Sequence, residues 1–244
     1  MDLQNIVDRI AEGLEYLDAH DFGGRVAQRD KQPFLAGVKT MYEREVTTKL
    51  AAWWNENYPS DFGSTGEVRA EVPYPTRRSI KCDLVAFGGG GTPVWAIEVK
   101  HIALVGDNGK KNDYGVTKML SPYLKDRSLR HDLVKMRSSD GFKCDAATIV
   151  YSFGYSPKTM AEAISRFPSE VSSRIKELDL VRKSVQDVRG TYSIEPMIEI
   201  ANMVLTSEHL VENHAQQSFV AWKHPCGGEG LVAGWSAKLN INAR

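Results

Sequence analysis

Residues 80–100 read IKCDLVAFGGGGTPVWAIEVK, and this stretch decides the fold that we expect. Its two halves are apolar and rich in β-branched and aromatic residues, which is typical of strands. The glycine run between them tolerates the positive φ angles of a tight connection. The sequence therefore predicts two strands, over residues 80–87 and 93–104, that form a hairpin in the middle of a covered sheet.

Three charged residues, Asp83, Glu98 and Lys100, interrupt these apolar strands. Burying them is unfavourable unless the charges are paired or bind something. Side chains alternate between the two faces of a strand, so Glu98 and Lys100 point to the same face. The hairpin can bring Asp83 beside them, although the sequence leaves its register open. A Glu-x-Lys pair alone also fits a simple salt bridge, and the upstream acid is what favours a functional site.

Two carboxylates and an amine at one spot suit the hydrolysis of a phosphodiester. Carboxylate oxygens are the ligands that Mg²⁺ prefers. A Mg²⁺ ion held by Asp83 and Glu98 would bind a phosphate oxygen and lower the pKa of water. Lys100 would orient the attacking water or stabilise the developing negative charge. The sequence thus predicts metal-assisted cleavage of a phosphate ester.

A further acid comes from a helix that we expect over residues 35–57. At about 100° per residue, Glu43 falls on the apolar face of this helix, whereas Glu45 projects to nearly the opposite side. That face consists of Val46, Leu50, Trp53 and Trp54. Either Glu43 reaches the metal site directly or through water, or it is an ordinary acid near a helix start. We expect both tryptophans to lie in the core.

The remaining pattern predicts helices on both sides of a sheet. Alternation or apolar runs predict strands over residues 66–73, 146–153, 219–222 and 231–241. Amphipathic spacing predicts helices over residues 3–17, 129–138, 156–167 and 169–184, and residues 195–203 fit a helix or a strand. This is an α/β class with a central mixed sheet of about four to six strands. We expect one domain over residues 1–244, with a catalytic core at about 35–155 and an elaboration at about 156–244.

These elements, in this order, resemble the PD-(D/E)XK nuclease superfamily, which is restriction-endonuclease-like in fold. The resemblance covers residues 41–153, including the later helix with Asp132 and Lys135. It rests on a helix Glu, then an Asp, a turn, and Glu-x-Lys on the next strand. Cys82 stands where the motif's name places proline, a residue that is often absent in the superfamily.

The resemblance implies a role for each matching residue. Asp83, Glu98 and Glu43 would be the acids of a Mg²⁺ site, in which Mn²⁺ substitutes, and the carbonyl of Val99 would be a further ligand. Lys100 would be the catalytic lysine. The implied activity is a metal-dependent endonuclease acting on double-stranded DNA, in restriction or defence. A homodimer would cut both strands, and the sequence leaves the oligomeric state open.

Three other functions stay open at this point. One is a nuclease of the same fold that acts on RNA or on branched or damaged DNA. Another is a non-catalytic module that binds nucleic acid or protein. The third is an α/β domain in which the strand charges form a buried ion pair, and it predicts no binding of divalent metal. A panel of substrates and a metal titration separate them.

Charge and cysteine content bear on partners and compartment. The formal net charge is zero, yet residues 110–137 hold eight Lys or Arg against three acids. A local basic face of this kind can attract a polyanion. DNA contacts are therefore expected from Lys110, Lys111, Lys125 and Arg127. Three widely spaced cysteines favour a reducing compartment, hence the cytoplasm, and no apolar run is long enough for a membrane span.

The histidines carry less weight. His101 follows Lys100 directly and so points to the other face of the strand, where we expect a packed or hydrogen-bonded ring and not a catalytic base. His209, His214, His224 and Cys226 have spacings that fit no compact zinc module.

Overall fold

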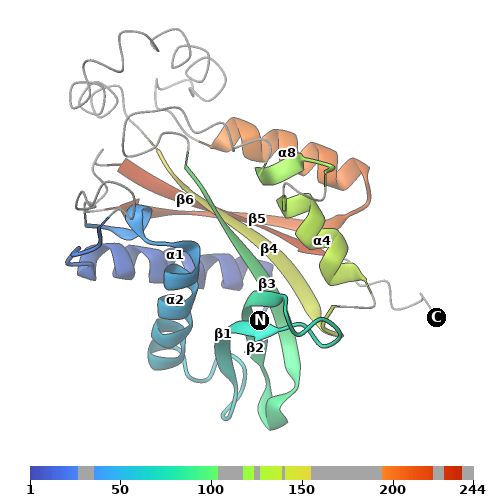
Figure 1. Ribbon diagram of the computed structural model, residues 1–244, viewed down its shortest axis with the longest axis horizontal. Coiled ribbons are helices and arrows are strands. Elements are labelled where there is room, and N and C mark those ends of the chain that lie inside the picture. Colours follow the sequence, from blue (N-terminus) through green and yellow to red (C-terminus); the bar gives the residue numbers. More distant parts are fainter. Residues whose placement is uncertain are drawn as a thin grey trace, which may run out of the picture.

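The fold is a six-stranded mixed sheet with helices on both faces (Figure 1). The computed structural model describes residues 1–26, 36–103, 118–123, 127–138, 141–154, 194–221 and 228–237. The strands lie in the order β1-β2-β3-β4-β6-β5. The α/β class and the mixed sheet predicted from the sequence are confirmed.

The first half of the sheet contains the stretch that decided the fold. β1 (Glu67–Pro73), β2 (Lys81–Phe87) and β3 (Pro93–Ile102) form an antiparallel meander. After β3 the chain passes through α4 (Leu129–Arg137) and returns as β4 (Asp145–Phe153), which is parallel to β3. A parallel neighbour requires such a crossover, because a tight turn joins only antiparallel strands.

The second half of the sheet is antiparallel. β6 (Gly228–Ala237) pairs with β4, and β5 (Val211–Ala221) pairs with β6 at the edge. We predicted the first of these strands only from residue 219, but β5 begins at Val211. Its earlier part is polar because the outer positions of an edge strand face solvent. The predicted end of β6, at residues 238–241, lies outside the described residues.

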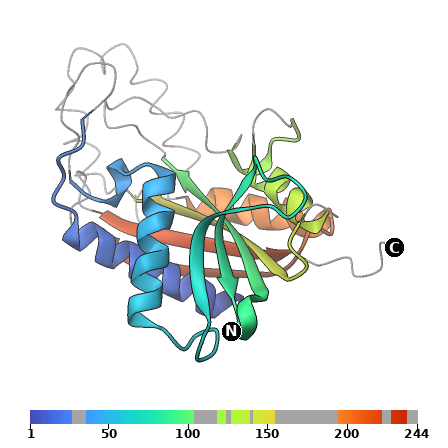
Figure 2. The same ribbon diagram turned by 60° about the horizontal axis from the view of Figure 1, so that its bottom comes forward.

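Two helices, α1 (Leu3–His20) and α2 (Glu43–Asn57), cover one face of the sheet (Figure 2). α1 begins with a capping box at Asp2, and its apolar positions recur every three or four residues, which gives one continuous buried face. Gly13 allows α1 to approach α2 closely, since a Cβ there would lie 2.6 Å from Leu50. Trp53 and Trp54 are buried as predicted.

The other face of the sheet packs against α4 and α8 (Glu195–Ser207). Leu133 and Met136 of α4 and Ile198 of α8 belong to this second core, together with Trp235 of β6. The segment that fitted either a helix or a strand is thus helical. Pro196 occupies its first turn, where a missing N–H removes no helical hydrogen bond.

The helix predicted over residues 35–57 begins later, at Glu43. A short 3₁₀ helix, Val38–Thr40, precedes it and follows Gly37, whose φ of 114° favours glycine. Two acids at the end of α1, Asp18 in its last turn and the C-cap residue Asp21, hold this turn. Asp18 accepts a hydrogen bond from the N–H of Val38 at 2.9 Å, and Asp21 accepts one from the N–H of Gly37 at 2.5 Å. These contacts between distant segments override the helical pattern of the sequence.

Several predictions concern residues outside the described ranges. They are the helices over residues 156–167 and 169–184, and the DNA contacts Lys110, Lys111 and Lys125. Within the described residues, no helix is both long enough and apolar enough to cross a membrane.

Candidate active site

The candidate site begins where β2 and β3 stop pairing. Their backbone register runs from Phe87↔Pro93 to Leu84↔Ile97. One residue further, the Asp83 carboxylate accepts a hydrogen bond from the backbone N–H of Val99 at 2.7 Å. A side chain therefore takes the place of a backbone partner and fills the gap between the two strands.

An irregularity in β1 and β2 turns Asp83 toward this gap. Cys82 and Val85 pack in the same core cluster although they are three residues apart, which strict alternation would not allow. On β1, which pairs with β2, Glu71 adopts a left-handed φ of 58°. Its neighbours Ala70 and Val72 pair with β2, but Glu71 itself does not. A non-glycine residue in this region is strained. The strand is bent at the level of Asp83, and the side chain leaves the regular pattern.

The structure brings Asp83 and Glu98 together, as the sequence predicted. Burial is the main cause that raises the pKa of Asp83 to about 8, and the nearby Glu98 carboxylate raises it further by charge and by hydrogen bonding. The N–H of Val99 and the charge of Lys100 act in the opposite direction. Two carboxylates that share a site behave in this way when no cation lies between them. Asp83 makes no ion pair within the part of the chain that the structure describes.

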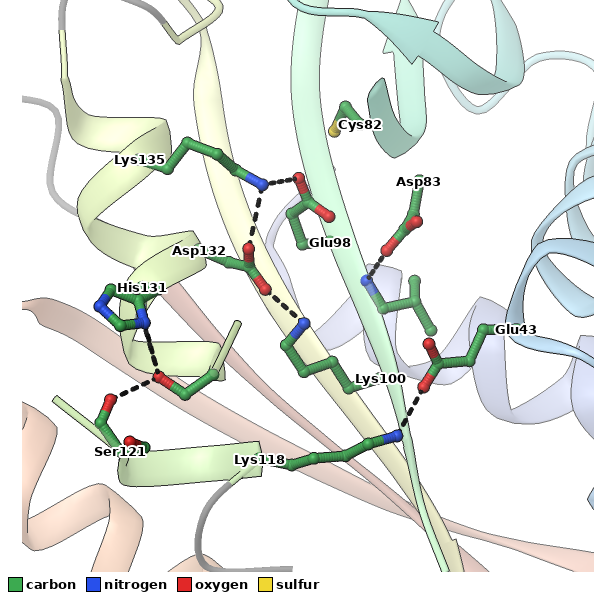
Figure 3. Close-up of polar contacts among 12 residues, drawn as sticks. Glu43, Cys82, Asp83, Glu98, Lys100, Lys118, Ser121, His131, Asp132 and Lys135 are labelled. Carbon is green, nitrogen blue, oxygen red and sulfur yellow. Dashed lines mark hydrogen bonds and ion pairs between the residues drawn. The ribbon is translucent and has the colours of Figure 1, made fainter. Parts of the chain in front are cut away.

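Glu98 is the more deeply buried of the two acids, with an exposed fraction of 5%. Its Oε1 atom accepts a hydrogen bond from the Tyr74 hydroxyl at 2.6 Å and lies 2.7 Å from Nζ of Lys135 (Figure 3). Burial raises the pKa of Tyr74, and neighbouring Cys82 and Glu98 add to the effect, so the hydroxyl stays a donor. Glu98 is therefore held from two sides.

Lys100 points to the same face as Glu98, as predicted, and reaches α4. Its Nζ lies 2.6 Å from Oδ2 of Asp132, whose Oδ1 is 2.9 Å from Nζ of Lys135 (Figure 3). Burial alone would lower the pKa of Lys100, but the negative charges of Asp132, Glu98 and Glu43 together offset it and the pKa is raised. Lys100 is consequently an ammonium ion at neutral pH.

The start of α4 is fixed by hydrogen bonds of Ser128. This N-cap residue accepts a hydrogen bond from the N–H of His131 and donates one to the carbonyl of Ser121 at 2.7 Å. A capped helix start restrains the first turns of α4, which carry Asp132 and Lys135. These two residues are one turn apart and share a face, so both reach the strand charges.

Glu43 lies at the border of this cluster, on the first turn of α2. It accepts hydrogen bonds from the backbone N–H of His101 at 2.9 Å and from Nζ of Lys118 at 3.1 Å. Its side chain is 43% exposed. The negative charge of Glu43 raises the pKa of Lys100, but its hydrogen bonds are with His101 and Lys118. The structure thus brings Glu43 near Lys100, in contact with Lys118.

His101 is packed, as predicted. Its ring stacks on Tyr151 with centroids 4.8 Å apart and an interplanar angle of 4°. Burial lowers the pKa of His101 to about 3, and the charges of Lys118 and Lys39 lower it further. The ring is neutral and turned away from the carboxylates, on the α2 side of the sheet.

Asp83 and Glu98 suit one hard divalent cation. Mg²⁺ is usually bound through one or two carboxylates, with water and phosphate oxygens completing its shell. No group of three or more His, Cys, Asp or Glu side chains converges within the described residues, so the side chains offer this pair. The N–H and C=O of a strand residue point to the same side. The Val99 carbonyl accordingly faces the gap that holds Asp83, and a cation there would offset the charge that raises the pKa of Asp83.

Sequence reasoning overlooked two partners of Glu98. Tyr74 stands between two prolines, in a segment that we interpreted only as the end of a strand. Lys135 was noted only as part of the later helix, because a helical lysine carries no signal of which strand it will meet. Arg127, an expected DNA contact, is exposed and adopts a left-handed φ of 46°.

No protein-family model matches this chain, and neither a curated protein nor a solved structure matches it.

Proposed function

We propose that this protein is a Mg²⁺-dependent nuclease that hydrolyses phosphodiester bonds in DNA at Asp83, Glu98 and Lys100. One observation carries the proposal. The buried carboxylate of Glu98 and the half-buried carboxylate of Asp83 lie side by side, and Asp83 makes no ion pair among the described residues. Burial of such a pair is unfavourable without a ligand, and strongly perturbed groups of this kind cluster at functional sites.

Asp83, Glu98 and the carbonyl of Val99 would hold the ion, for which Mn²⁺ would substitute. The bound ion would supply positive charge to the scissile phosphate and lower the pKa of an attacking water. Lys100 donates hydrogen bonds as an ammonium and stabilises negative charge that develops on the phosphate. Its raised pKa argues against a role as general base. Asp132 keeps Lys100 in place through their contact at 2.6 Å.

Two further points support this proposal over a plain α/β domain. A buried ion-pair network accounts for Glu98, Lys100, Asp132 and Lys135, but within the described part of the chain this network includes no ion pair of Asp83. The order of elements, α2 then three strands, α4 and β4, also agrees with the resemblance to the PD-(D/E)XK nucleases, whose restriction-endonuclease-like fold we propose for this chain.

In this proposal Glu43 contributes as the helix acid, at the border of the site. Arg127 would contact DNA, together with Lys110, Lys111 and Lys125 if these lie beside it. Double-stranded DNA as substrate, and a setting in restriction or defence, rest on the family resemblance alone. A homodimer would allow both strands to be cut.

The test is cleavage of supercoiled plasmid, linear duplex, single-stranded DNA and RNA, each with Mg²⁺, Mn²⁺ or EDTA. The wild type is compared with Asp83→Asn and Lys100→Ala, and with Glu56→Gln as a control on an exposed acid of α2. We expect metal-dependent cutting that falls at least about 100-fold in both site variants, the range of losing one electrostatic contact in a transition state. Cutting of RNA alone would show that the substrate is RNA and not DNA. Absence of metal binding would overturn the proposal.

A further inference from the structure

Lys135 contacts the same carboxylate, Glu98, that the proposed cation would bind. Its Nζ lies 2.7 Å from Oε1 of Glu98, the same atom to which Tyr74 donates a hydrogen bond. The Lys135 side chain comes from α4 across the face of the sheet and is 28% exposed, whereas the Glu98 side chain is 6% exposed. A positive charge of the protein itself therefore neutralises Glu98.

Lys135 also has a second anionic partner, Asp132, which it can still contact when a metal ion binds Glu98. Its Nζ lies 2.9 Å from Oδ1 of Asp132, on the same helix. Asp132 in turn contacts Lys100 at 2.6 Å, so one carboxylate holds both lysines. Figure 3 shows the two ammonium groups on either side of Asp132, with Lys135 reaching on to Glu98.

We propose that Lys135 is a built-in counter-ion that competes with the divalent metal for Glu98 and moves to a phosphate of the bound nucleic acid when the metal enters. This inference rests on the proposed function and adds a regulatory feature to it. A divalent ion and an ammonium cannot both bind the Oε1 side of one buried carboxylate without strong repulsion. A phosphate in the site would offer Lys135 a new anionic partner.

The consequence is a coupling between metal and nucleic acid. Metal alone must displace Lys135 from Glu98 and leave this ammonium with Asp132 only. When a phosphate is present, the displaced ammonium gains a contact, so each ligand tightens the other by the same factor. The site would fill with metal mainly when substrate is there. Idle metal binding, and with it undirected cleavage, would be suppressed.

The experiment is a calorimetric titration of the metal-free full-length protein with Mn²⁺ and with Mg²⁺, without nucleic acid. The main variant is Lys135→Gln, which keeps hydrogen-bond donors for Glu98 and Asp132 but removes the charge. Lys135→Met is a second variant, and circular dichroism checks that each is folded. The control is Lys118→Gln, which removes a neighbouring ammonium that contacts Glu43 and not Glu98.

We expect Lys135→Gln to bind metal about tenfold more tightly than the wild type, equivalent to ~1.4 kcal/mol. The metal affinity of Lys118→Gln should stay within about twofold of the wild-type value. Lys118 does not contact Glu98, so solvent and salt screen the effect of its charge on the metal. In cleavage assays, raising the DNA concentration should lower the Mg²⁺ requirement of the wild type but not of Lys135→Gln.

Two results overturn the inference in different ways. If the wild type and both Lys135 variants bind metal equally, or if Lys118→Gln has the same effect, Lys135 does not compete and the proposed nuclease function still stands. If neither the wild type nor any Lys135 variant binds Mn²⁺ or Mg²⁺, the proposed function fails as well.

Discussion

The carboxylate of Asp83 accepts a hydrogen bond from the backbone N–H of Val99, at the point where β2 and β3 separate. An acid that replaces a strand partner is held in the plane of the sheet and close to the next acid, Glu98. This relationship ties the shape of the hairpin to the electrostatics of the site. Burial at this point raises the pKa of Asp83, so the stability of the fold depends on pH through this carboxyl.

The first prediction concerns Asp83→Asn in metal-free buffer. The pKa of Asp83 is about 8 in the folded protein against 3.8 for an ordinary aspartate, so the folded state retains a proton between these values. Stability contributed by this proton falls as pH rises through that window. Asparagine keeps the acceptor for Val99 without the charge. We expect the melting temperature of Asp83→Asn to exceed that of the wild type increasingly from pH 5 to about pH 8, and by a constant amount above that pH.

Thermal unfolding by circular dichroism in EDTA measures this difference. A tenfold change in proton affinity amounts to ~1.4 kcal/mol, or ~3–6 °C in melting temperature for a domain of this size. Asp145→Asn, at an exposed position where β4 begins, serves as control and should show no such trend. Parallel curves for the wild type and Asp83→Asn would contradict the prediction. Added Mn²⁺ should stabilise the wild type and not the variant.

The second prediction concerns Asp132 as a positioning residue for Lys100. In Asp132→Asn the burial that lowers the pKa of Lys100 is no longer offset by the adjacent carboxylate. As the pH is raised, the cleavage rate of Asp132→Asn should therefore begin to fall at a lower pH than the cleavage rate of the wild type. Asp132→Glu should restore part of the profile. A lower rate with an unchanged pH profile would show that Asp132 has only a structural role.

The third prediction concerns Glu43, whose contacts are with Lys118 and the backbone of His101. We expect Glu43→Gln to retain metal affinity within about threefold, because glutamine can still accept the N–H of His101. Asp83→Asn should lose at least about tenfold, since a lost ligand charge removes more than ~1.4 kcal/mol. Calorimetry with Mn²⁺ compares the two. An equal loss in both variants would make Glu43 a ligand.

The fourth prediction is that Thr148→Val stabilises the protein. Thr148 lies beside Glu98 in the register of β4 and is 1% exposed, and its Oγ1 has no hydrogen-bond partner among the described residues. Valine has the same shape without the hydroxyl, so we expect a gain of ~1 kcal/mol in the free energy of unfolding. Thr47→Val is the matched control, because its buried hydroxyl donates to the carbonyl of Arg44. A gain in both variants, or a loss in Thr148→Val, would argue against this account.

The fifth prediction concerns the contact between α1 and α2. Alanine is favoured over glycine by ~1 kcal/mol inside a helix. At Gly13, however, a Cβ would lie 2.6 Å from Leu50 and 2.8 Å from Trp53. Overpacking of this kind costs about 1–3 kcal/mol, so Gly13→Ala should lower stability. In a Leu50→Ala background the same substitution should be less harmful, which urea unfolding of the four proteins would measure.

The sequence by itself determined the elements that depend on local pattern. The hairpin at residues 80–100, the apolar face of α1 and the position of Glu98 and Lys100 on one face of β3 all follow from periodicity and turn chemistry. These features depend on neighbours a few residues away, so the local sequence contains the information needed to predict them. The proximity of Asp83 to Glu98 also followed from the hairpin, although its register did not.

The tertiary structure decided what depends on distant contacts. α2 begins at Glu43 and not near residue 35, because Asp18 and the C-cap residue Asp21, at the end of α1, hold the preceding turn. The bend that aims Asp83 at Val99 lies opposite a strained Glu71 on a neighbouring strand. The pairing of Lys135 with Glu98 depends on how α4 packs across β3. Charges compete for partners only after folding has placed them within a few ångströms, and no local pattern records that distance.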